Sequence, residues 1–224
     1  MPDPTAQRLS TIRQRIATAA AGRPATLVAV SKTQPAARVR ELHALGQSVF
    51  GENYVQEALA KMAELTECAI EWHLIGPLQS NKCREVAEHF DWMQTLDRAK
   101  LIPLLARYRP DRRAPLNVLV QVNLDDEDSK SGAHPADVDA LVDAVARQPR
   151  LRLRGLMSIP KPWPDPDRRR AGFRALHAMF QALKQRHPGI DTLSMGMSED
   201  FELALAEGAT MVRVGSALFG PRTA

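Results

Sequence analysis

Hydrophobic residues recur along this chain in two alternating patterns, one typical of helices and one typical of buried strands. Near the amino terminus, Leu9, Ile12 and Ile16 follow helical spacing with polar residues between them, which predicts an amphipathic helix over residues 5–21. A glycine and a proline then end this helix. Segment 27–33 reads Leu-Val-Ala-Val-Ser-Lys-Thr, and its short apolar run is typical of a strand buried on both faces.

The same alternation continues along the rest of the chain. Short apolar runs predict strands, and apolar side chains at helical spacing predict a helix between each pair of them. The further predicted strands are 48–51, 70–75, 92–95, 116–122, 153–159, 192–194 and 211–214. The predicted helices are 36–45, 57–65, a segment ending near residue 90, 98–108, 137–146, a helix whose centre is 173–185, and 201–206.

Eight strands that alternate with helices in one series predict a parallel sheet with right-handed crossovers. In 224 residues such a series predicts an α/β fold, a (β/α)₈ TIM barrel with a leading amino-terminal helix. An open doubly wound sheet is the alternative, although no G-x-G-x-x-G motif follows the first strand. No composition shift marks a boundary, so we expect residues 1–224 to form a single domain, with the proline-rich segment 160–166 as a loop.

Composition and charge narrow the class of protein. The two cysteines, Cys68 and Cys83, show no disulfide spacing, which favours a reducing, cytoplasmic environment. We expect no membrane segment and no signal peptide, because no apolar run is long enough and the first residues lack the pattern. The net charge is +4, with arginines gathered in segments 109–113 and 168–170. Acidic residues accompany both segments and aromatic residues do not alternate with them, so we expect no nucleic acid partner.

Lys32 is the first candidate for chemistry, because it lies at the end of the first predicted strand. Parallel α/β folds place their functional groups at the carboxyl ends of the strands. A partly desolvated lysine there disfavours its ammonium form and becomes an amine nucleophile. Position alone slightly favours a side chain that extends into water, and the rest of the chain reverses that preference.

Two turns rich in glycine and serine follow the seventh and eighth predicted strands. Ser194, Gly196 and Ser198 belong to the first turn, and Gly215 and Ser216 to the second. In TIM barrels these two loops commonly form a phosphate site with the help of a short helix. Glycine permits close approach of the backbone, and serine offers a hydroxyl beside the helix amides. Ser198 alone is better explained as a helix N-cap, but the paired turns favour a phosphate site.

Arg213 lies between Val212 and Val214 in the last predicted strand, so its side chain points to the opposite face from theirs. A buried arginine requires an acceptor. Either a carboxylate such as Glu199 pairs with it or a ligand supplies the acceptor, and the sequence leaves both possibilities open.

A lysine at the first strand, a phosphate site at the last two and an arginine beside that site describe a ligand with an aldehyde and a phosphate. Pyridoxal 5′-phosphate (PLP) is such a ligand, because a lysine can form a Schiff base with it while a protein group faces its pyridine nitrogen. An arginine in that position favours an unprotonated ring and a weaker electron sink. This setting suits limited carbanion chemistry or none.

Five segments of the chain carry a family resemblance: 29–33, 50–57, 72–82, 194–200 and 212–220. Through them the chain resembles the pyridoxal phosphate homeostasis proteins (the YggS/PROSC family), single barrels similar to the amino-terminal domain of alanine racemase. Segment 123–132 also fits the loop that follows the fifth strand in this family. The resemblance implies a Schiff base on Lys32, phosphate contacts from Ser198, Gly215 and Ser216, and Arg213 at the ring nitrogen. Ser216 stands where many members carry threonine, and it keeps the hydroxyl.

The roles of four other residues in these segments are less defined. Asn53, at the end of the second strand, either contacts the edge of the cofactor or caps the following helix, and both remain open. His73 lies within a strand, and we expect a core histidine. Lys82 and Lys130 could contact an anionic ligand, but a solvated helix face is the better expectation for Lys82, and nothing further supports Lys130.

Two functions are compatible with a PLP-binding barrel. One is a non-catalytic protein that holds, buffers or delivers PLP, and the other is a fold-type III PLP enzyme such as an amino-acid racemase. Racemisation needs two bases, which in similar racemases are the lysine and a tyrosine from a further domain. This chain has only Tyr54 and Tyr108, and neither is well placed. We therefore expect a monomeric carrier with PLP-dependent apoenzymes as partners; a phosphate-binding isomerase without PLP is a more distant alternative.

Overall fold

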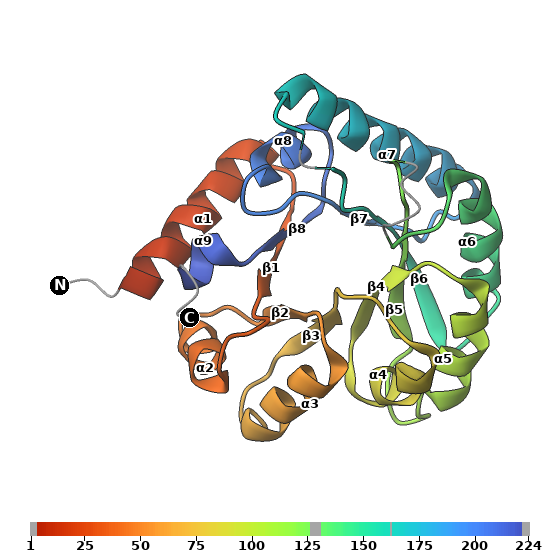
Figure 1. Ribbon diagram of the computed structural model, residues 1–224, viewed down its shortest axis with the longest axis horizontal. Coiled ribbons are helices and arrows are strands. Elements are labelled where there is room, and N and C mark those ends of the chain that lie inside the picture. The colour runs from red at the N-terminus through yellow and green to blue at the C-terminus, as the bar shows by residue number, and fades with distance from the viewer. Residues whose placement is uncertain (1–3, 126–130, 162, 221–224) are drawn as a thin grey trace.

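Eight parallel strands form a closed barrel in the computed structural model, which describes residues 4–125, 131–161 and 163–220. Each strand pairs with the next in chain order, and the first strand also pairs with the eighth. Helices surround the barrel on its outer face (Figure 1). This arrangement confirms the predicted TIM barrel with its leading helix and excludes the open doubly wound sheet.

The observed elements follow the predicted order. The strands are β1 (Thr26–Val30), β2 (Val49–Glu52), β3 (Glu71–Leu74), β4 (Trp92–Leu96), β5 (Leu116–Gln121), β6 (Leu151–Met157), β7 (Thr192–Ser194) and β8 (Met211–Val214). The helices are α1 (Pro4–Ala20), α2 (Ala36–Ala44), α3 (Val55–Glu64), α4 (Cys83–His89), α5 (Ile102–Tyr108), α6 (Val138–Ala146), α7 (Pro166–Arg186), α8 (Phe201–Ala206) and α9 (Ser216–Phe219). Short 3₁₀ turns at Ser80–Lys82, Ala99–Leu101 and Pro135–Asp137 precede α4, α5 and α6.

The strands separate two groups of buried side chains, one outside the barrel under the helices and one inside the barrel. The main apolar core lies between the strands and the helices, and in β8 it includes Val212 and Val214. Arg213 is buried on the other face of the same strand, inside the barrel, which confirms its predicted orientation. The barrel interior also contains a small apolar group, formed by Val28, Trp92, Leu119, Met157 and Met211.

The first strand is shorter than the sequence pattern predicts. Its pairing with β2 ends at Val30, and Ser31 then donates its backbone N–H to Gly51 O at 3.0 Å. Thr33 has a φ of +63°, in the left-handed region that non-glycine residues seldom occupy. Lys32 therefore lies in a turn at the carboxyl end of the barrel and not in the strand.

The seventh helix contains its predicted centre, 173–185, and extends toward the amino terminus because it begins in the charged segment ahead of its apolar face. The Asp165 side chain accepts a hydrogen bond from the Asp167 backbone N–H at 2.9 Å and caps the helix. Arg170 in the second turn forms an ion pair with Glu207. The arginines at 168–170 thus belong to the first turns of α7.

The leading helix packs beside α8 and α9 on the outer face of the barrel (Figure 1). Its predicted apolar face, Leu9, Ile12 and Ile16, is buried, and Arg8 donates from Nε to Leu218 O at 2.7 Å. Among the residues that the structure describes, none of the helices combines the length and the apolar character that a bilayer crossing requires.

Candidate functional site

A cavity of about 230 Å³ opens at the carboxyl ends of the strands. It brings together six of the residues that the sequence singles out: Lys32, Asn53, Ser198, Arg213, Gly215 and Ser216. The other lining residues, which sequence reasoning did not single out, are Val30, Gln34, Ile75, Ile159, Met197, Phe219 and Gly220. Five of these seven carry apolar side chains; three of the five, Ile75, Ile159 and Met197, lie in loops, where an isolated apolar residue carries no periodic signal.

A buried ion cluster lies behind the turn that carries Lys32. Lys61 Nζ on α3 lies 2.7 Å from each of Glu52 Oε1, Glu57 Oε1 and the backbone oxygen of Ser31. The Ser31 hydroxyl also donates to Glu52 Oε1 at 2.6 Å. Burial raises the pKa of Glu52, and its bonds to Lys61 and Ser31 oppose that effect.

The same cluster reaches the residue that follows Lys32. Glu57 Oε1 accepts the backbone N–H of Thr33 at 2.6 Å. The cluster therefore contacts the backbone on both sides of Lys32 and stabilises the left-handed conformation at Thr33. Since Lys32 itself lines the cavity, the cluster sets the position from which its amine reaches a ligand.

The turns after β7 and β8 form a further part of the cavity wall, next to the strand that precedes Lys32. Ser198 Oγ accepts the backbone N–H of Gly215 at 3.3 Å and lies 3.4 Å from Ser216 Oγ. A Cβ at Gly215 would lie 3.3 Å from Val30 Cβ and from Val30 O, so glycine lets the turn after β8 lie close to the end of β1. Asp200, not Ser198, is the N-cap of α8, so the N-cap explanation for Ser198 does not apply.

Ser194 and Gly196 lie in the same segment but are not among the described residues that line the cavity. Ser194 is fully buried inside the barrel, where its hydroxyl contacts Arg213 and Gln94. Gly196 has a φ of +92°, and a Cβ there would lie 2.5 Å from Ala204 Cβ on α8. Direct contact of these two residues with a ligand stays a prediction.

Arg213 has hydroxyl and carbonyl partners inside the barrel. Nη1 donates to Ser194 Oγ at 2.6 Å and Nη2 donates to Ser158 O at 2.9 Å. Burial lowers the pKa of Arg213 to about 10, and Asp200 acts in the opposite direction. Within the described residues Arg213 forms no ion pair with Glu199 or any other carboxylate; neutral acceptors, Ser194 Oγ and Ser158 O, take the place of the expected carboxylate, and contact with a ligand stays a prediction.

The other polar residues of the motifs have separate positions. Asn53 lines the cavity, and the N-cap of α3 is Tyr54, which forms no capping bond through its side chain. His73 is completely buried, as expected for a core histidine. Lys82 lies outside the cavity beside Glu85, at 3.4 Å, and keeps 30% of its side chain exposed. Lys130 lies outside the described residues.

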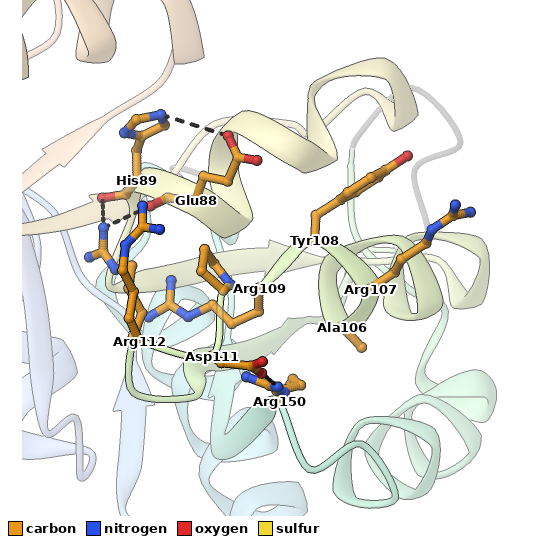
Figure 2. A pocket seen from close by; sticks show the side chains of 11 residues that line it. Glu88, His89, Ala106, Arg107, Tyr108, Arg109, Asp111, Arg112 and Arg150 are labelled. Atoms are coloured by element: carbon orange, nitrogen blue, oxygen red, sulfur yellow. Dashed lines mark hydrogen bonds and ion pairs between the residues drawn. The ribbon is translucent and has the colours of Figure 1, made fainter.

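The arginines of segment 109–113 line a larger cavity, about 900 Å³, formed by the loops that lead into β4, β5 and β6 (Figure 2). Arg109 is buried and donates from Nη1 to Ala87 O at 2.8 Å and to Phe90 O at 2.7 Å. Its Nε donates to Ala114 O at 2.7 Å. These bonds satisfy carbonyls at the carboxyl end of α4, so Arg109 has a structural role at the end of the barrel opposite Lys32.

We expect Arg109→Met to destabilise the protein by about 2 kcal/mol, because several buried carbonyls lose their donor. Urea unfolding followed by circular dichroism measures this loss. The matched control is Arg112→Met in the same loop, where the side chain is exposed and the unfolding midpoint should not change. Equal midpoints for the two variants would contradict the structural role of Arg109.

The barrel, the lysine in the turn after β1 and the serine and glycine turns after β7 and β8 define a protein of the alanine racemase amino-terminal-domain class. The family model of that domain, described as alanine racemase, N-terminal domain, matches residues 7–223 of this chain. Alanine racemase from Corynebacterium glutamicum shares the fold, with a TM-score of 0.66 and 18% identity over 98% of this chain and 61% of that chain.

Closer relatives identify the particular family. The chain is 54% identical to the pyridoxal phosphate homeostasis protein of Pseudomonas aeruginosa, over 94% of this chain and 91% of that protein. PipY of Synechococcus elongatus, whose structure was solved with PLP bound, matches with a TM-score of 0.87 and 40% identity, over 96% of this chain and 100% of that chain. The chain belongs to the pyridoxal phosphate homeostasis protein family, as the sequence motifs predict.

Proposed function

We propose that this protein binds PLP through a Schiff base on Lys32 Nζ and serves, without catalytic turnover, in intracellular PLP homeostasis. The buried guanidinium of Arg213 is the observation that carries this proposal. It is 3% exposed, lines the cavity and is paired with no carboxylate among the described residues. Ser194 Oγ and Ser158 O accept from two of its N–H groups, and a remaining N–H group can donate to the unprotonated ring nitrogen of PLP.

The rest of the cavity fits the same ligand. When bound, PLP supplies an aldehyde for the amine and a conjugated ring. Lys32 lines the cavity together with Ser198 and Ser216, whose hydroxyls lie 3.4 Å apart at the start of the short helix α9. Paired hydroxyls and the start of a short helix after the last strands suit a phosphate group. Asn53 also lines the cavity and offers an amide for a polar substituent of the ring.

The side chains around the cavity support a carrier over a racemase. Among the described lining residues, Lys32 carries the one amine, and none carries a carboxylate, an imidazole or a phenol that could serve as a further base. Racemisation requires a second base on the other face of the substrate. Tyr54 is 60% exposed and outside the lining, and Tyr108 lies on α5 beneath the guanidinium of Arg84. Neither tyrosine fills the role of second base.

The proposal extends to compartment and partners. Both cysteines are unpaired, which fits a reducing cytoplasm as the place of action. A carrier must also release its ligand, and PLP-dependent apoenzymes are the recipients that we propose. We also propose that the carrier acts as a monomer.

Titration of the purified protein with PLP tests this function. We expect a Schiff-base absorbance band, reduction of that bond by borohydride and, after digestion, a modified peptide that contains Lys32. The loaded protein should not interconvert the enantiomers of alanine or of other common amino acids, as chiral chromatography would measure. Clear racemase turnover would overturn the non-catalytic role, and a protein that ignores PLP would overturn the whole proposal.

A further inference from the structure

A continuous series of hydrogen bonds crosses the barrel interior from the cavity to the opposite end. Arg213 Nη1 donates to Ser194 Oγ at 2.6 Å, and the Ser194 hydroxyl donates to Gln94 Oε1 at 2.7 Å. Gln94 Nε2 lies 2.7 Å from His73 Nδ1, and His73 Nε2 lies 2.8 Å from Glu71 Oε1. These residues come from β8, β7, β4 and β3, so the series links strands on different sides of the barrel.

The chemistry of the two ends determines the direction of every bond. An arginine can only donate, so Ser194 Oγ accepts from Arg213 and its single proton must go to Gln94 Oε1. The Gln94 amide nitrogen then faces His73 and donates to Nδ1. His73 consequently carries its proton on Nε2, from which it donates to the Glu71 carboxylate. Burial lowers the pKa of His73, which agrees with this neutral form.

Gln94 is the central member of the series, and both polar atoms of its side-chain amide have hydrogen-bond partners. Its side chain is completely buried, and its Nε2 also lies 3.2 Å from Met211 Sδ. His73, which follows it in the series, stacks on Trp92 with ring centroids 5.0 Å apart and planes 9° apart. At the far end, 44% of the Glu71 side chain is exposed at the start of β3. The amide of Gln94 thus has a partner for its oxygen and for its nitrogen.

We propose that Gln94 is a positioning residue for Arg213. By accepting the Ser194 proton, it keeps the Ser194 oxygen turned toward Arg213 as an acceptor. With Ser158 O as the second acceptor, the guanidinium is held in one orientation, and its remaining N–H groups can serve a ligand in the cavity. This inference rests on the proposed function, in which Arg213 faces the ring nitrogen of PLP.

The test compares two glutamine-to-methionine variants of the full-length protein. Gln94→Met removes the acceptor for Ser194 and the donor to His73. Gln47→Met is the matched control, because Gln47 is equally buried and donates to Leu27 O and Val49 O near the opposite end of the strands. For each variant we would measure the PLP dissociation constant, the absorbance maximum of bound PLP and the thermal midpoint without PLP.

We expect Gln94→Met to raise the dissociation constant about tenfold and to move the absorbance maximum, because a misoriented guanidinium changes the surroundings of the ring. Gln47→Met should lower the thermal midpoint comparably while both PLP properties stay as in the wild type. Gln94→Glu should bind nearly as well as the wild type, because its carboxylate accepts the same Ser194 proton and its second oxygen accepts a proton that His73 gains on Nδ1. If Gln94→Met does not fold, Ser194→Ala must show the same tenfold loss.

Several outcomes would overturn the inference. Wild-type affinity and spectrum in Gln94→Met would do so, and so would an equal loss of affinity in Gln47→Met, since the effect would then follow general stability. A wild-type protein that forms no Schiff-base band would have a different meaning. It would overturn the proposed function itself, whatever the variants of Gln94 do.

Discussion

Lys32→Ala will abolish the Schiff-base absorbance band and will raise the apparent dissociation constant for PLP about 100-fold, or about 2.8 kcal/mol. The reason is that Lys32 is the one amine among the described residues that line the cavity. Without it, the ligand keeps the serine hydroxyls and Arg213 but loses the covalent bond. Absorbance titration measures both effects, and borohydride should no longer attach PLP to the protein.

Lys82→Ala is the matched control for this result. Lys82 also lies near the carboxyl end of the barrel, but it is directed toward Glu85 and does not line the cavity. The control should keep the band, the affinity and the borohydride product of the wild type. Both variants should unfold at the wild-type temperature without PLP, because neither side chain is fully buried. A persistent band in Lys32→Ala would show that another amine holds the ligand.

The fold could be predicted from the sequence because its signals are local. Apolar runs and helical spacing repeat along the chain, and eight repeats specify the barrel without any information on tertiary contacts. The orientation of Arg213 followed from strand alternation alone. The sequence correctly predicts Lys32 at the carboxyl end of the barrel, although its strand ends two residues earlier. The reason is that all the strands present their carboxyl ends at the same end of the barrel.

The supporting contacts of the site could not be predicted, because they depend on partners that are distant in the sequence. The sequence groups Ser194 with Ser198 as a ligand-binding serine of the same turn. In the structure its hydroxyl points into the barrel toward Gln94, one hundred residues away. Glu57 and Lys61 have the spacing of an exposed helical ion pair. In the structure Lys61 is 5% exposed, since the turn before Lys32 and the buried Glu52 cover it.

Lys61→Met will destabilise the protein by about 4 kcal/mol at neutral pH, the largest loss of stability that we expect from a single substitution. The side chain of Lys61 is 6% exposed and that of Glu52 is completely buried, so removal of the ammonium leaves a buried carboxylate without its counterion. The backbone oxygen of Ser31 loses a donor as well. Urea unfolding measures the change, and Lys184→Met on the exposed face of α7 should leave the midpoint unchanged.

The pH dependence of Lys61→Met separates the charge effect from loss of packing. Burial already raises the pKa of Glu52, and removing Lys61 takes away the main influences that oppose this rise. A carboxyl group with a raised pKa in the folded state stabilises that state below its unfolded pKa and loses this contribution as pH rises through the folded pKa. The difference in unfolding free energy between the wild type and Lys61→Met should therefore shrink as pH falls toward 4.5, the ordinary pKa of a glutamate. Adding Glu52→Gln should restore stability at neutral pH, and a deficit that is independent of pH would mean that packing alone is lost.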